Sequence, residues 1–187
     1  MNRKGLILGV IAFLIICAES SILHRIEIYG IVPNLSLCLI VSSSLLLGSR
    51  TGGRLGLFVG LVQDLMFMRV IGFFTLVFFL VGYIAGMFKN RFDQNNLLLS
   101  VMITALFDFA FCLICYLFLH YLQGRIQISF YLTRRILPEL VYTTIASIPV
   151  YLFTRWVCWL SDRREEKRRR LEENAAMPAE AGGADVI

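Results

Sequence analysis

The sequence predicts an all-α integral membrane protein, a bundle of six transmembrane helices with both termini in the cytoplasm. Hydrophobic residues make up 58% of the chain, and its mean hydropathy is +0.73. A soluble domain averages roughly 45–50% apolar residues, so we expect the bilayer to solvate much of this chain. The apolar residues fall into six segments, each near the roughly 20 residues that cross a hydrocarbon core. These segments are 5–22, 31–48, 53–68, 71–88, 97–120 and 137–160.

The distribution of Lys and Arg predicts the orientation of the bundle. With the N-terminus inside, twelve of these residues flank the spans on the cytoplasmic side and five on the outer side. Cytoplasmic flanks normally carry such an excess. Asn2-Arg3-Lys4 is similar to the start of a signal peptide, but no small-residue cleavage site follows before Glu19. We therefore expect the first span to stay as an anchor.

The composition changes after the last span. We expect a membrane domain at 1–160 and a charged, largely disordered cytoplasmic tail at 161–187, and no polar stretch is long enough for a soluble catalytic domain. Basic residues directly after the last span are suited to the headgroups of anionic lipids. Nucleic-acid binding is not expected, because no folded basic domain or aromatic platform accompanies them. The residues are Arg163, Arg164, Lys167, Arg168, Arg169 and Arg170.

The third span carries a stripe of small residues. Gly52, Gly56, Gly60 and Asp64 follow one another at intervals of four. Glycines at this spacing allow another membrane helix to pack closely. Asp64 adds a carboxyl group inside the span, where ionisable groups usually face protein. Further structural or helix-packing positions are predicted at Pro33, Asn34, Gly72, Gly82 and Gly86.

The ionisable residues of the spans allow two interpretations. One hypothesis is a polar crevice that opens outward, with Asp64 as its deepest secure point and two arginines as ion-pair partners. The alternative, which the sequence favours, is that Glu19 and Glu139 lie at the headgroups while the acids inside the membrane hydrogen-bond neighbouring helices. The candidate crevice residues are Glu19, Asp64, Asp108, Glu139, Arg69 and Arg135.

No pattern predicts an enzyme, a cofactor or a metal site. All five cysteines lie in apolar spans, and the CxxC of Cys112 and Cys115 lacks a redox or zinc context. These two cysteines share a helix face with Ser100, Thr104 and Asp108, which is typical of helix packing. Phosphate loops, catalytic triads and HExxH motifs are absent from the sequence, as are the paired broken helices of inverted-repeat transporters.

The order of these features resembles the family of the rod shape-determining protein MreD. The resemblance depends on Pro33-Asn34 at the start of a helix, on Gly56-Leu-Phe-Val-Gly60-Leu-Val-Gln-Asp64-Leu65, and on Gly72 before the next span. It implies a non-enzymatic, multi-pass component of the cell-elongation machinery in the bacterial inner membrane. The bulky Phe67-Met68-Arg69 and the long charged tail depart from the family pattern.

The resemblance also implies partners. Relatives act with MreC, MreB filaments, RodA and a penicillin-binding transpeptidase in lateral peptidoglycan synthesis. We therefore expect a scaffold that docks the single spanning helix of an MreC-like protein, and self-association stays open. The family is also similar in architecture to the substrate-binding subunits of energy-coupling-factor transporters. The alternative function is thus a small-molecule-binding membrane subunit served by separate ATPases.

Overall fold

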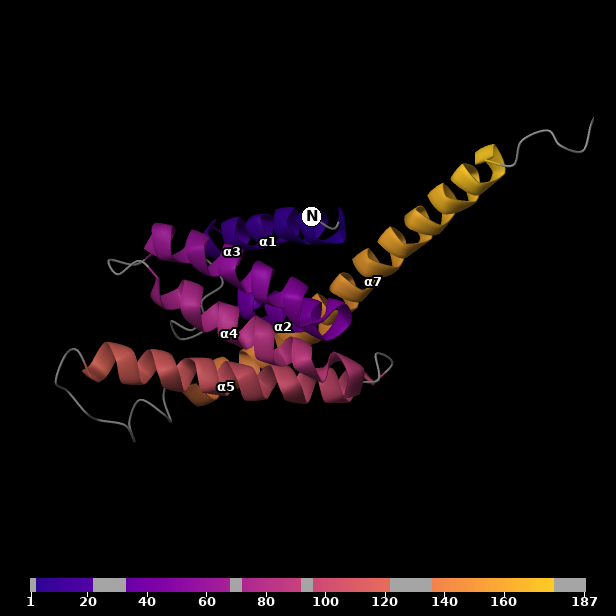
Figure 1. The fold of residues 1–187 in the computed structure, drawn as a ribbon. Coiled ribbons are helices and arrows are strands. Elements are labelled where there is room, and N and C mark those ends of the chain that lie inside the picture. Colours follow the sequence, from indigo (N-terminus) through magenta and orange to yellow (C-terminus); the bar gives the residue numbers. More distant parts are fainter. Residues whose placement is uncertain (1–2, 22–32, 68–71, 92–95, 122–135, 177–187) are drawn as a thin grey trace, which may run out of the picture.

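A computed structural model of the chain describes residues 3–21, 33–67, 72–91, 96–121 and 136–176, and the regular structure in these ranges is helical throughout (Figure 1). This confirms the predicted all-α fold class. The α-helices are α1 (Arg3–Ser21), α2 (Leu35–Leu47), α3 (Ser49–Phe67), α4 (Phe73–Met87), α5 (Leu97–Tyr121) and α7 (Leu137–Ala176), and the 3-10 helix η2 (Phe88–Arg91) follows α4.

Helix α2 is the centre of the bundle and contacts α1, α3, α4, α5 and α7. Every residue from Ser36 to Leu46 is buried, and the helix carries no charged residue. A helix that is apolar on all sides is typical of a position inside a bundle. At its start, the Asn34 side chain accepts a hydrogen bond from the backbone N–H of Leu37 at 2.9 Å. Asn34 therefore caps α2.

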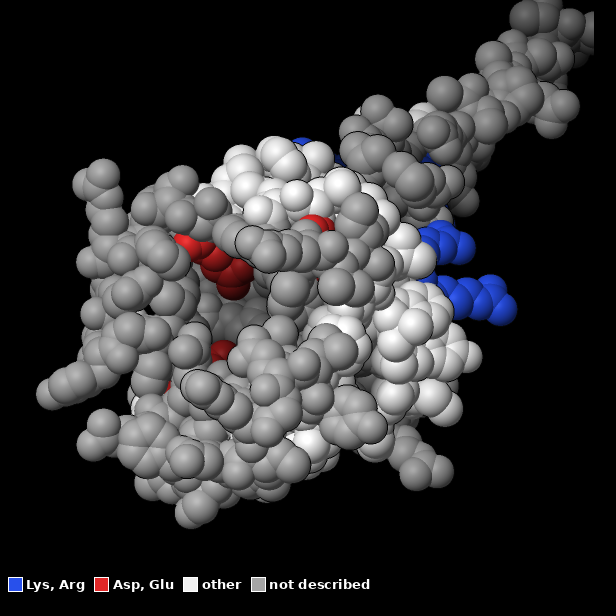
Figure 2. Space-filling model, turned by 90° about the vertical axis from the view of Figure 1, so that its left-hand side faces the viewer, with Lys and Arg blue, Asp and Glu red and all other residues white. Residues whose placement is uncertain are grey.

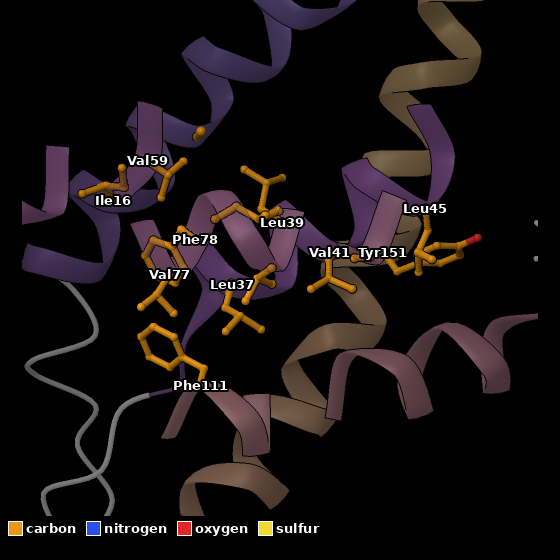
Figure 3. Packing of buried hydrophobic residues seen from close by; sticks show 14 of the residues in the cluster. Ile16, Leu37, Leu39, Val41, Leu45, Val59, Val77, Phe78, Phe111 and Tyr151 are labelled. Atoms are coloured by element: carbon orange, nitrogen blue, oxygen red, sulfur yellow. The ribbon is translucent and has the colours of Figure 1, made fainter. Parts of the chain in front are cut away.

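Side chains of the surrounding helices pack against α2 (Figure 3). Phe78 of α4 stacks on Phe111 of α5, with ring centroids 5.0 Å apart. Near the other end of α2, Tyr151 of α7 lies beside Leu45. Lipid tails are as apolar as these side chains, so van der Waals packing rather than the hydrophobic effect holds such helices together in a membrane.

Helices α3 and α4 form an antiparallel pair whose backbones touch. A Cβ atom added at Gly56 would overlap the backbone carbonyl of Phe78, and one added at Gly60 would overlap the backbone of Thr75. Residues larger than glycine at these positions would force the two helices apart. The centre of the predicted glycine stripe therefore faces α4.

The same contact continues toward the other end of α3. Gly52 and Gly82 each lie against the backbone of the other, and Gly86 lies against the backbone of Ser49. Gly72 is different, because it has a φ of 111° and nothing would lie within 4 Å of an added Cβ. Gly72 supplies a left-handed backbone conformation at the start of α4, whereas Gly52, Gly82 and Gly86 allow close helix packing.

Helix α5 is, within the described residues, the one helix that is long and apolar enough to cross a membrane, over Leu97–Phe118. Helices α2 and α4 are apolar but contain 13 and 15 residues. At about 1.5 Å per residue, both are shorter than a hydrocarbon core of about 30 Å. Length and composition thus support one of the six predicted spans, and the other five stay predictions.

Helix α7 departs from the predicted boundary between the membrane domain and the tail. It continues to Ala176 and projects well beyond the bundle (Figure 1). Residues 161–176 are therefore helical, where the sequence predicted a largely disordered tail. Arg, Glu, Lys and Leu dominate this segment and favour helix, and pairs four residues apart such as Glu166 and Arg170 add support. The remaining tail, 177–187, lies outside the described residues.

Replacing Gly56 with alanine tests the contact between α3 and α4. The added methyl group would overlap the Phe78 backbone, so we expect the free energy of unfolding to fall by about 1–3 kcal/mol. Gly9→Ala on α1 is the matched control, because nothing lies within 4 Å of a Cβ at that position. Unfolding of the purified proteins by SDS in mixed micelles measures both effects. Equal stability of the two variants would contradict the close contact.

Candidate functional site

Asp64 is fully buried near the end of α3 and caps the next helix. Its Oδ2 accepts the backbone N–H groups of Gly72 at 3.0 Å and Thr75 at 2.9 Å, and the Thr75 hydroxyl at 2.6 Å. Its Oδ1 accepts the N–H of Phe74 at 3.0 Å. The first N–H groups of a helix have no partner within the helix, and they carry partial positive charge. The Asp64 carboxylate therefore satisfies the N-terminus of α4.

Glu19 of α1 has the same role for α2. Its Oε1 accepts the backbone N–H of Ser36 at 2.7 Å, and its Oε2 accepts the Ser36 hydroxyl. Together with Asn34, it satisfies the first turn of α2. In both cases, a carboxylate near the end of one helix binds the first turn of the next helix.

Asp108, near the middle of α5, differs from these two acids. It is fully buried, and neither carboxylate oxygen has a hydrogen-bond partner of good geometry among the described residues. Thr143 and Glu139 of α7 are its polar neighbours. Cys38 of α2 is within electrostatic range of Asp108 and also of Glu19. Asp108 thus faces the junction of α2, α5 and α7.

Thr143 connects two helices at this junction. Its hydroxyl oxygen accepts the backbone N–H of Asn34 at 3.3 Å, and its carbonyl oxygen lies 3.6 Å from the Cys38 sulfur, which donates to it. Both bonds join α7 to the start of α2. The position of the Asp108 neighbours is therefore fixed by backbone contacts as well as by packing.

Acidic side chains of the described residues show together at the face at which α1 ends and α7 begins (Figure 2). Of the predicted crevice residues, Glu19 and Asp108 lie within electrostatic range of Cys38, and Glu139 lies within range of Asp108. Asp64 instead binds the N–H groups at the start of α4. Their predicted ion-pair partners, Arg69 and Arg135, lie outside the described residues. The crevice stays a hypothesis, now without Asp64 as its deepest point.

The sequence interpretation missed the hydroxyl groups of α2. Ser42 and Ser43 are fully buried, and within the described part of the chain their oxygens have no hydrogen-bond partner, like that of Ser100 on α5. Ser44 instead donates to the carbonyl of Ile40 at 2.6 Å. The run of three serines inside an apolar span was the signal in the sequence for these buried hydroxyls. Such a run is informative because a buried hydroxyl normally has a hydrogen-bond partner.

The defined polar contacts have a structural role. Over the described ranges, no three His, Cys, Asp or Glu side chains converge as a metal ion would require. The carboxylates with defined partners are bound to helix ends. Fold and site together define a helical, membrane-associated protein whose best-defined polar contacts fix the positions of its helices.

The chain belongs to the MreD family. Residues 1–159 match the model of that family, which is described as rod shape-determining protein MreD. The family has a role in rod shape determination, is membrane-associated and is not known as an enzyme. The resemblance seen in the sequence is thus confirmed. No curated protein and no solved structure matches the chain, so the similarity to energy-coupling-factor subunits stays a prediction.

The substitution Asp64→Leu tests the cap on α4. It removes four hydrogen bonds. At about 0.6 kcal/mol for each bond in a membrane protein, we expect the free energy of unfolding to fall by roughly 2 kcal/mol. Gln63→Leu is the control, because Gln63 is the half-buried neighbour of Asp64 and makes none of these bonds. SDS unfolding measures both variants. A loss no larger than that of the control would show that α4 does not depend on this carboxylate.

Proposed function

We propose that this protein is a non-enzymatic membrane scaffold of the bacterial cell-elongation complex, which makes lateral peptidoglycan. Membership of the MreD family over residues 1–159 carries the proposal. The structure supports a scaffold, because the glycine contacts and the Asp64 cap hold α3 and α4 together as one unit. Such a unit presents a fixed surface to other membrane helices.

The proposed arrangement is six spans in the inner membrane with both termini in the cytoplasm. Helices α1 and α3 each contain 19 residues, or about 28 Å at 1.5 Å per residue, close to the hydrocarbon thickness. Helix α2 is shorter, but it lies among other helices. Its ends can therefore meet protein rather than lipid, which is tolerated inside a membrane protein.

The projecting part of α7 supports a contact with the membrane surface. Trp159 is half-exposed and the Arg163 guanidinium lies 4.1 Å from its ring centroid, and tryptophan is enriched at the membrane interface. We propose that the basic residues beyond this point bind anionic headgroups. Exposed side chains among them are Arg163, Arg164, Lys167, Arg169 and Arg170, and the side chain of Arg168 lies outside the described part.

Exposed apolar side chains cover the outer faces of α3 and α4. In a bilayer, these faces contact lipid or another helix, and we propose that one of them accepts the single spanning helix of an MreC-like partner. RodA, a penicillin-binding transpeptidase, MreB and a second copy of this chain are further proposed members of the assembly. The exposed side chains are Leu57, Phe58, Leu61, Leu65, Leu76, Phe79, Leu80 and Tyr83.

A second candidate function is the small-molecule-binding subunit of an energy-coupling-factor type transporter. The acidic side chains that show together at one face of the molecule favour it (Figure 2). The two candidates predict different partners. A scaffold binds wall-synthesis proteins, whereas a transport subunit binds two ATPases and a transmembrane coupling protein.

Affinity purification of the full-length tagged protein in a gentle detergent tests the scaffold function. We expect mass spectrometry to identify MreC-like and RodA-like proteins. The double variant Gly56→Ile/Gly60→Ile should lose them, because it separates α3 from α4, whereas Gly9→Ile should retain them. Recovery of ATPases with a coupling protein would support the transport subunit instead. Unchanged recovery by the double variant would contradict the role of the α3–α4 pair.

Cysteine labelling tests the orientation. The variants are made in a protein without the five native cysteines. Asn96→Cys places an exposed thiol at the start of α5, and Leu137→Cys places one at the start of α7. In the proposed topology, these two helix starts lie on opposite sides of the membrane. We expect a membrane-impermeant maleimide to label residue 137 in intact spheroplasts, and residue 96 only after permeabilisation. Labelling of both residues from outside, or the reverse order, would overturn the proposed topology.

A further inference from the structure

One exposed stripe of side chains runs along most of α7, and its chemistry changes along the helix. Its members follow one another at intervals of three or four residues, so they share one helix face. The first part is apolar and ends in Trp156 and Trp159, whose exposed fractions are 58% and 50%. The stripe continues with Arg163, Lys167 and Arg170, which are all exposed. Its apolar members before the tryptophans are Val141, Ile145, Ile148 and Leu152.

The opposite face of α7 packs against the bundle. Thr143, Tyr151 and Thr154 on that face are buried, and the helix contacts α2 and α5. The α7 stripe therefore faces away from these two helices. An exposed apolar surface of this length marks a contact with a membrane or with another protein, and the family is membrane-associated.

The order of the groups along the α7 stripe matches the order of the groups along a phospholipid. Ile148 and Trp159 are eleven residues apart, or about 16 Å at 1.5 Å per residue. This length is close to one leaflet, which is half of a hydrocarbon core of about 30 Å. Tryptophan is enriched at the level where acyl chains give way to headgroups. Arg163, one turn beyond Trp159, then lies at the level of the phosphates.

Arg163 is held in position by the stripe itself. Its guanidinium carbon lies 4.1 Å from the centroid of the Trp159 ring, within the range of a cation–π contact. Arginine has five N–H donors and binds phosphate groups in a bidentate manner. Lys167 adds a second positive charge one turn further along. The second charge favours a headgroup with net negative charge over one that also carries an ammonium group.

We propose that the α7 stripe is a binding site for one anionic phospholipid. The phosphate binds Arg163 and Lys167, the glycerol region contacts the indoles of Trp156 and Trp159, and an acyl chain lies along the apolar part of the stripe. The inference rests on the proposed contact of α7 with anionic headgroups. It adds that one face of the helix, rather than the whole basic run, selects the lipid.

Tryptophan fluorescence tests the site, because both tryptophans of the chain lie on the α7 stripe. The full-length protein is reconstituted in phosphatidylcholine vesicles that contain the same small mole fraction of either brominated phosphatidylglycerol or brominated phosphatidylcholine. Bromine on the acyl chain quenches an indole that it contacts. We expect the anionic lipid to show an about fivefold preference for the site, the ratio that corresponds to roughly 1 kcal/mol for a basic residue near an anionic surface.

Two variants with the same loss of charge separate the stripe from the rest of the basic run. Arg163→Gln should lose most of the preference for the anionic lipid. Arg164→Gln should keep it, because this exposed residue lies at nearly the same depth but about 100° round the helix. One and two turns before Arg164, Leu160 and Val157 are half-buried, so its face does not continue the α7 stripe.

Three outcomes would overturn the proposal. Equal quenching by the two brominated lipids in the unmodified protein would show that no anionic lipid is selected. Equal loss of preference in the two variants would remove the site and leave a general attraction of α7 to anionic headgroups. Quenching by neither lipid would show that another protein covers the stripe or that it lies outside the bilayer. Recovery of partner proteins by affinity purification tests the scaffold function independently of all three.

Discussion

The hydrogen bonds at the starts of α2 and α4 are the constraint on which this bundle depends. Water is not available inside a bilayer to satisfy the first N–H groups of a helix. In α2 and α4, a carboxylate from the preceding helix satisfies them. Asp64 reaches α4 only because the glycines of α3 hold the two backbones in contact and in register. Capping and close packing in this pair therefore depend on each other.

The central position of α2 follows from its composition. A helix with apolar residues and serines on every side has no face that requires water, so it can be surrounded by the other helices. Its small serines also allow close approach, as where Gly52 of α3 lies against Ser44. The outer helices then combine an exposed apolar face with a small or polar face toward α2. Helix α5 shows this division, with Leu98 and Leu106 exposed and Thr104 and Asp108 buried.

Properties that depend on local spacing could be predicted from the sequence. The helical fold class, the family and the glycine stripe follow from intervals between residues, and Asp64 was a candidate for a bond to a neighbouring helix. The particular N–H groups that Asp64 binds could not be predicted, because they depend on the register of α3 against α4. The polar neighbours of Asp108 lie on α2 and α7, which are distant from α5 in sequence. The helix at 161–176 was not predicted, although its Arg, Glu, Lys and Leu residues favour helix.

The length of α7 has a mechanical consequence. Its 40 residues form one rod of about 60 Å, twice the thickness of a hydrocarbon core. A force on its projecting end acts through a long lever arm on the helix start, where Glu139 and Thr143 meet Asp108. Pro149 lies inside this rod and removes a backbone hydrogen bond, so bending concentrates there. A pull at the projecting end and the geometry around Asp108 are thus connected through a single helix with a bend at its proline.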